Sequence, residues 1–136
     1  MPNYWLVKTE PGTYSFSDLQ KAGEAVWDGV SNPVALKHLR AMQTGDCVFI
    51  YHTGAEKQIV GIARVTRGAY PDPKAGDPKL VVVNLKALEP VARPVTLAEV
   101  KARPEFADFE LVRQGRLSVM PVSAASWKLL RALAGG

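Results

Sequence analysis

The sequence predicts an α+β fold built on a mixed, mostly antiparallel β-sheet that curls toward a barrel. Strand-like segments crowd together between residues 47 and 88, which favours antiparallel pairing of neighbours. Four helix-capping patterns lie between and beside these segments. The 136 residues are 47% hydrophobic and 22% charged, the balance of a globular domain that can bury its own core. We therefore expect one domain that spans residues 1–136.

Runs of apolar, aromatic and β-branched residues predict six strands. They cover residues 4–9, 24–28, 47–52, 58–67, 79–88 and 117–122. Gly61 interrupts the fourth run, which indicates a β-bulge or a close approach of another group to the backbone. A proline-rich stretch, residues 70–78, is expected to form an irregular loop before the fifth strand.

Residues that cap helix N-termini predict four short helices. The helices should begin after Ser15, Asn32, Thr96 and Ser123. Ser15 and Thr96 are each followed three residues later by an acidic residue, which is the capping-box pattern. Asn32 precedes a proline that suits the first helical position, and Gly23 is expected to end the first helix. His38 is expected on the solvent side of the second helix.

The charge and the cysteine content indicate a class of partner and a compartment. The net charge of +4 and the pI of about 9.3 are compatible with a polyanionic partner such as nucleic acid. The single cysteine, Cys47, cannot form an internal disulfide and favours a reducing compartment. The sequence has no signal-peptide pattern and no apolar run of about 20 residues. We expect a soluble, cytoplasmic monomer with no membrane association.

Sequence motifs for catalysis or metal binding are absent. His52 could pair with Cys47 or Ser118 as nucleophile and with Asp46 as the acid, but no GxSxG or cysteine-protease motif surrounds them. There is no HExxH, Walker or GxGxxG pattern either. We expect no catalysis, no metal and no cofactor.

Aromatic and polar residues at strand ends are the remaining candidates for a site. Trp27 ends the second strand and is followed by a glycine-containing turn. A large ring beside such a turn can form one wall of a slot for a planar heterocycle, held by stacking and by hydrogen bonds to its edge. A second polar cluster, Lys8, Thr9 and Glu10, follows the first strand. The alternatives are a core or rim role for Trp27, capping alone for Asn32 and a solvated strand end for residues 8–10.

Several segments, taken in order, resemble EVE-domain proteins. They include YWLVKTEP at residues 4–11, WDGVSN at 27–32, FIYHT at 49–53 and RLSV at 116–119. Further matching segments are residues 39–42, 45–46, 59–63, 69–72 and 121–122. The similarity covers nearly the whole chain. This resemblance implies a PUA-like fold, a curled sheet flanked by short helices, and a relationship to YTH domains, which hold a methylated adenine in an aromatic pocket.

The resemblance also implies roles for individual residues. Trp27 would stack on a modified base, bordered from the turn by Gly29, Val30, Ser31 and Asn32. Lys8, Thr9 and Glu10 would approach its polar edge. Tyr51, His52 and Thr53 would close the opposite wall, supported by Arg116, Leu117 and Ser118. The chain departs from the family in three places. Ser31 stands where arginine is usual, and Thr53 where serine is usual. Residues 33–37 replace a Tyr-Gln or similar pair that commonly precedes an Ala-Arg-Asn run.

The leading hypothesis is a non-catalytic module that binds a modified base, methylated or hydroxymethylated, flipped out of DNA or RNA. One alternative is a protein that binds a free nucleobase or another small molecule in the same pocket. A second alternative is a nucleotide-modifying enzyme that uses His52 and Glu10. A reader of nucleic acid needs basic residues around the pocket mouth to contact phosphates. The candidates are Lys37, Arg40, Arg64 and Arg116.

Overall fold

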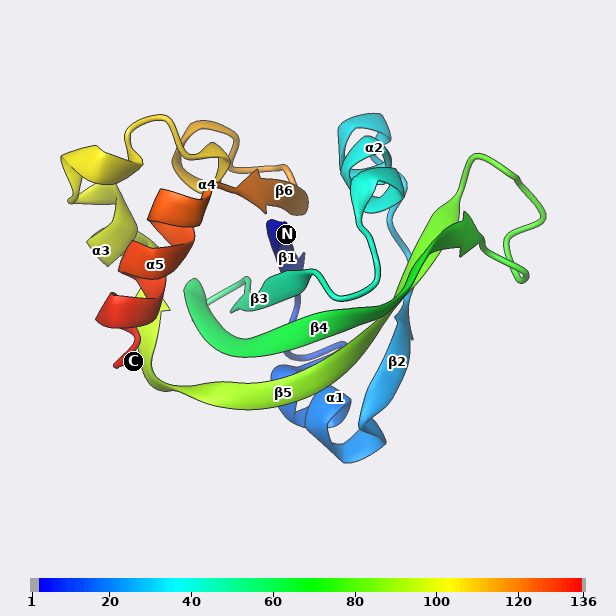
Figure 1. The fold of residues 1–136 in the computed structure, drawn as a ribbon, viewed down its shortest axis with the longest axis horizontal. Helices are drawn as coiled ribbons and strands as arrows, with labels where there is room; N and C mark the ends of the chain where they lie inside the picture. The colour runs from blue at the N-terminus through cyan, green and yellow to red at the C-terminus, as the bar shows by residue number, and fades with distance from the viewer. Residues whose placement is uncertain (1–2, 136) are drawn as a thin grey trace.

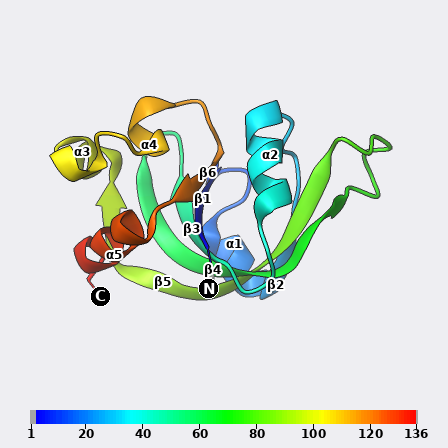
Figure 2. The ribbon, with the colours of Figure 1, turned by 45° about the horizontal axis from the view of Figure 1, so that its top comes forward.

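The computed structural model describes residues 3–135, which form one curled six-stranded sheet with short helices around it (Figure 1). The strands are β1 (Tyr4–Thr9), β2 (Glu24–Trp27), β3 (Cys47–His52), β4 (Gln58–Pro71), β5 (Val81–Thr96) and β6 (Val119–Val122). The helices are α1 (Phe16–Ala22), α2 (Pro33–Ala41), α3 (Leu97–Lys101), α4 (Glu110–Arg113) and α5 (Ala124–Leu133), with a 3₁₀ turn, η1 (Pro104–Phe106). Helices α3, α4 and α5 gather at one end of the molecule, the turn between β4 and β5 forms the other end, and α2 stands between them (Figures 1 and 2).

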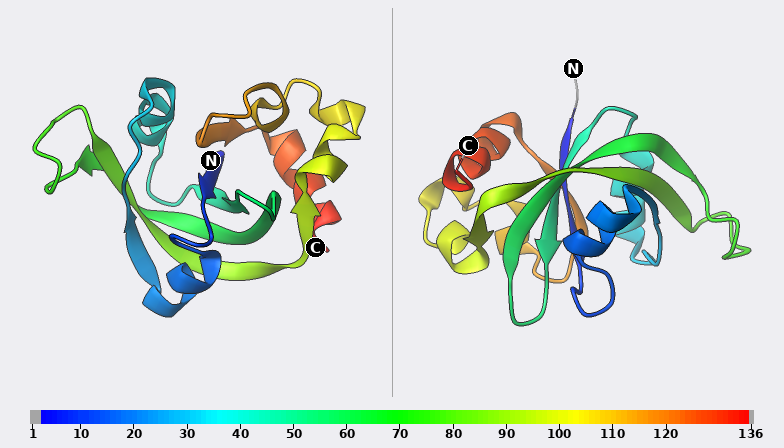
Figure 3. Two further views of the ribbon diagram at one scale, coloured as in Figure 1. Left: turned by 180° about the vertical axis from the view of Figure 1, so that it is seen from behind. Right: turned by 90° about the horizontal axis from the view of Figure 1, so that it is seen from below.

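The strand order is β2-β5-β4-β3-β1-β6, and every neighbouring pair is antiparallel except β1 and β3. That pair is parallel because α1, β2 and α2 lie between the two strands in the chain. The predicted α+β class with a curled, mostly antiparallel sheet is confirmed. The sheet curls without closing, so β2 and β6 remain its two outer strands (Figure 3).

The predicted helix caps form as expected. The Ser15 hydroxyl accepts from the Asp18 N–H, and the Asp18 carboxylate accepts from the Ser15 N–H; Thr96 and Glu99 repeat this capping box at α3. The Asn32 side chain accepts from the N–H groups of Val34 and Ala35, the second and third residues of α2. These bonds satisfy backbone donors that a helix leaves unpaired at its start.

Strands β4 and β5 are longer than the sequence predicted. We expected residues 70 and 71 to lie in a loop and the fifth strand to end at residue 88, but the two strands pair from Gln58↔Thr96 to Pro71↔Val81. Four register shifts interrupt this ladder, and one of them lies beside Gly61, which pairs with Pro90. Bulges accommodate a proline that would end a regular strand. The sequence also missed η1 and α4, which have no side-chain cap.

Gly61 and His38 illustrate how packing decides local structure. A Cβ on Gly61 would overlap the ring of Phe16, so the predicted close approach is confirmed along with the bulge. His38, which was expected to face solvent, is half-buried, and its ring lies 6.1 Å from the ring of Trp5. No helix within residues 3–135 is long and apolar enough to cross a membrane.

Candidate ligand-binding cavity

A cavity of about 650 Å³ lies in the opening that the curled sheet leaves between its edges. One side comes from β2 and the turn after it, and the other from the end of β1, the segment before α1 and Ser118. Its lining residues are Lys8, Thr9, Thr13, Tyr14, Ala25, Val26, Trp27, Asp28, Gly29, Val30, Ser31, Asn32 and Ser118. Strands β1 and β2 are far apart in the strand order, so only the curl of the sheet brings them to one cavity.

Two aromatic rings form a corner of this cavity. Trp27 is only 7% exposed, yet it lines the cavity. The ring of Tyr14 meets it edge to face, with the centroids 6.1 Å apart and the planes at 78°. This arrangement is a favourable one for an aromatic pair, because the positive edge of one ring meets the negative face of the other. Burial, and the nearby carboxylate of Asp18, raise the pKa of the Tyr14 hydroxyl.

A half-buried ammonium group lies on the opposite side of the sheet opening. Lys8 Nζ donates to the carbonyl of Gly115 at 2.9 Å and lies 5.6 Å from the centroid of the Tyr51 ring. Burial lowers the pKa of Lys8. Within residues 3–135, Lys8 makes no ion pair with a carboxylate.

The remaining polar groups of the cavity come from two turns. The Thr9 hydroxyl donates to the Tyr14 carbonyl at 2.6 Å, which ties the segment before α1 to the end of β1. Gly29 adopts a φ of 78°, a left-handed conformation that lets the backbone turn sharply after Trp27. The Asn32 side-chain oxygen caps α2, while its amide nitrogen has no partner among the described residues.

The structure brings together eight of the residues singled out from the sequence. Lys8, Thr9, Trp27, Gly29, Val30, Ser31, Asn32 and Ser118 all line the cavity. Arg116 and Leu117 line a neighbouring hollow of about 270 Å³, which Asn32 shares. Glu10, Tyr51, His52 and Thr53 are not on the cavity wall, so the expected opposite wall from residues 51–53 is absent.

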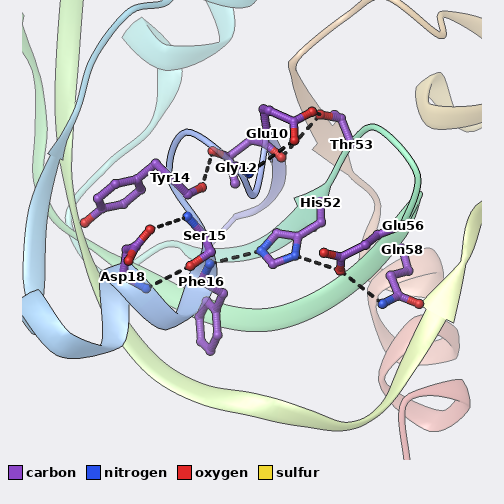
Figure 4. A network of polar contacts seen from close by, with 11 residues as sticks. Glu10, Gly12, Tyr14, Ser15, Phe16, Asp18, His52, Thr53, Glu56 and Gln58 are labelled. Carbon is purple, nitrogen blue, oxygen red and sulfur yellow. Dashed lines mark hydrogen bonds and ion pairs between the residues drawn. The ribbon is translucent and has the colours of Figure 1, made fainter.

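His52 belongs instead to a buried contact with α1 (Figure 4). Its Nε2 accepts from the backbone N–H of Phe16 at 3.0 Å, so the neutral ring carries its proton on Nδ1. Nδ1 therefore donates to the Glu56 carboxylate, which is also 3.0 Å away. This bond lowers the pKa of Glu56. Nε2 thus holds the start of α1 to β3, and Nδ1 holds the loop between β3 and β4.

Glu10 is held by its own turn and by the loop after β3. Its carboxylate accepts from the Gly12 N–H at 3.2 Å and from the Thr53 hydroxyl at 3.3 Å (Figure 4). The ring of Tyr14 points away from this cluster. Glu10, His52 and Thr53 therefore join loops and helix to the sheet.

Sequence reasoning missed five lining residues. They are Thr13, Tyr14, Ala25, Val26 and Asp28. Asp28 could have been predicted, because it lies between Trp27 and Gly29 in the turn that was singled out from the sequence. Tyr14 carried no such signal, since only the fold places the residue before the Ser15 cap beside Trp27.

A curled sheet with an aromatic-cornered cavity between its edges defines a PUA-like binding domain. The sequence profile of the EVE domain matches residues 3–133, so the chain belongs to the EVE domain family. An NMR structure of a protein from Rhodopseudomonas palustris is similar, with 47% identity, a TM-score of 0.93 and coverage of 98% of this chain and 93% of that one. Mouse thymocyte nuclear protein 1 is 29% identical over 98% of this chain and 74% of its own length.

One solved relative contains nucleic acid. The crystal structure of human THYN1 protein in complex with 5-methylcytosine-containing DNA is similar to this chain, with a TM-score of 0.86 and 28% identity. The similarity covers 98% of both chains.

Proposed function

We propose that this protein binds a modified cytosine, flipped out of a DNA strand, in the cavity between β1 and β2. The observation that carries this proposal is the aromatic corner of Trp27 and Tyr14 inside a cavity with polar groups around it. A flipped base is held by stacking on aromatic side chains and by hydrogen bonds to its edge. The similarity to human THYN1 protein, solved with 5-methylcytosine-containing DNA, supports the same ligand class.

The cavity offers complementary groups for the parts of a modified cytosine. Trp27 and Tyr14 supply ring surface, and the Asp28 carboxylate can accept from the exocyclic amine. Ala25 and Val26 add apolar surface for a 5-methyl group. Burying one methyl contributes about 0.8 kcal/mol, so contact with the methyl alone gives roughly a fourfold preference over cytosine.

We also propose that the protein is a reader without catalytic activity. An enzyme that used His52 as a base would need a free imidazole nitrogen, but both are engaged in hydrogen bonds. Glu10, its suggested partner, is bound by Gly12 and Thr53 away from the cavity. Within residues 3–135, no group of three His, Cys, Asp or Glu side chains is placed to hold a metal ion.

Fluorescence anisotropy with matched oligonucleotides tests the proposal. The set contains cytosine, 5-methylcytosine or 5-hydroxymethylcytosine at one position, in single-stranded DNA, duplex DNA and RNA. We expect at least one modified DNA to bind severalfold more tightly than its unmodified match. Equal affinity for all DNAs would contradict the proposal. Tight binding of free 5-methylcytosine, with no affinity for any strand, would favour the small-molecule alternative.

A further inference from the structure

Among residues 3–135, no carboxylate acts as a counter-ion for Lys8 at the edge of the cavity. Its ammonium group has three N–H donors, and the structure assigns one of them to the Gly115 carbonyl. Two donors remain, and no carboxylate of a described residue pairs with this group. Asp28 lines the same cavity but forms no ion pair with it. A half-buried charge of this kind gains from an anionic partner, because burial has removed part of its hydration.

A second hollow shares Asn32 with the cavity and is bordered by Gly115, whose carbonyl accepts from the Lys8 ammonium group. The hollow is lined by Asn32, Val34, Gln114, Gly115, Arg116 and Leu117. Asn32 borders both spaces, and Lys8 Nζ is bonded to Gly115 on the wall of the second. A backbone bond from the Lys8 N–H to the Ser118 carbonyl, 2.9 Å long, fixes the loop of Arg116 against β1. Arg116 is exposed and makes no ion pair with a described residue.

We propose that Lys8 and Arg116 bind the phosphate of the nucleotide whose base occupies the cavity. This inference rests on the proposed function and specifies its ligand as a nucleotide. Only the sugar separates a base from its phosphate, so the anion must lie beside the base cavity. Lysine and arginine donors in this position form charge-assisted hydrogen bonds to phosphate oxygens. The unpaired amide nitrogen of Asn32 adds a neutral donor between the two spaces.

The direct test compares a nucleoside with its nucleotides. Binding of 5-methyl-2′-deoxycytidine and of its 3′- and 5′-monophosphates is followed by NMR titration. We expect one monophosphate to bind about tenfold more tightly than the nucleoside, the scale of one hydrogen bond to a charged group. Lys8→Met, which retains the aliphatic stem over Tyr51, should remove most of this difference. Arg116→Gln should reduce it less, because Arg116 is exposed.

Lys128→Met is the matched control, because Lys128 is exposed on α5, at the end of the molecule away from β2 (Figure 1). It should leave the difference unchanged, and thermal unfolding checks that every variant is folded. On a modified oligonucleotide, Lys8→Met should also lower the slope of log affinity against log salt by about 0.7–0.9, the loss of one phosphate contact.

Equal affinity of nucleoside and monophosphates would overturn the inference, as would equal weakening of both by Lys8→Met. An unchanged salt slope would overturn it as well. In each case a retained preference of the wild type for modified oligonucleotides would leave the proposed function intact. If the wild type shows no such preference, the proposed function itself has failed.

Discussion

The ends of β1 and β3 are neighbours in the sheet, yet their polar side chains differ in role: one lines the cavity and the other stabilises the fold. The two strands are parallel, with Lys8 beside Tyr51 and Thr9 beside His52. At the end of β1, Lys8 lines the cavity, and two N–H donors of its ammonium group have no partner among the described residues. At the end of β3, both ring nitrogens of His52 are hydrogen-bonded, one to Phe16 and the other to Glu56. Residue type at a strand end therefore does not identify a binding group; the hydrogen-bonding capacity that remains after folding does.

Because both nitrogens of His52 are bonded within the fold, loss of His52 should lower the stability of the protein and leave its recognition of modified DNA unchanged. His52→Ala removes the acceptor of the buried Phe16 N–H, and an unsatisfied buried donor costs about 1–3 kcal/mol. Urea unfolding should show this loss in the free energy of unfolding. Under conditions where the variant is folded, its preference for modified over unmodified DNA should equal that of the wild type. Unchanged stability with a lost preference would place His52 in the binding site.

A smaller effect is expected at the aromatic corner. Tyr14→Ala removes the edge-to-face partner of Trp27, an interaction on the order of 0.5–1.5 kcal/mol. In the proposed complex Tyr14 also supplies ring surface to the bound base, and loss of an aromatic contact on this scale should lower the affinity for modified DNA roughly two- to tenfold. Tyr14→Phe is the matched control, because it retains the ring and loses only the hydroxyl, so its affinity should stay close to that of the wild type. Equal losses in both variants, measured by anisotropy, would show that the hydroxyl is what matters.

The smallest expected effect concerns pH and Glu56. The bond from His52 lowers the pKa of Glu56 in the folded protein below its ordinary value of 4.5. A carboxyl of this kind stabilises the fold above the unfolded pKa, and this contribution is lost as pH falls through the lowered folded pKa. As pH falls below 4.5 and through the lowered pKa of Glu56, the Glu56→Gln variant should therefore lose less stability than the wild type. Parallel acid-unfolding curves would contradict the contact, while binding at neutral pH should be the same in both.

Local signals in the sequence predicted much of the fold. The capping residues Ser15, Asn32 and Thr96 begin helices as expected, because each bond is made within three residues of chain. The full lengths of β4 and β5 could not be predicted, since prolines in them are tolerated only through register shifts that depend on the partner strand. The same limit applies to α4 and η1, which lack side-chain caps and depend on packing.

Some residues of the candidate site could likewise be predicted from local sequence, and others could not. Trp27 and the turn after it could be singled out because an aromatic residue next to a glycine turn is a local pattern. Tyr14 could not, because its position beside Trp27 depends on how α1 packs. No sequence pattern distinguishes the role of Lys8 from that of His52, since both are polar residues at the ends of apolar strands. Their different roles depend on Gly115 and Phe16, which are distant in the chain.

Trp27→Ala is the sharpest test of whether Trp27 holds the modified base. Anisotropy with matched 5-methylcytosine and cytosine oligonucleotides gives the ratio of the two affinities. Base–aromatic stacking contributes about 1–3 kcal/mol, so affinity for the modified strand should fall roughly ten- to a hundredfold and the ratio should approach one. Because Trp27 is buried, Trp27→Phe provides a milder variant, expected to keep the fold and lose part of the preference. Folded variants that bind both strands in the wild-type ratio would contradict the account.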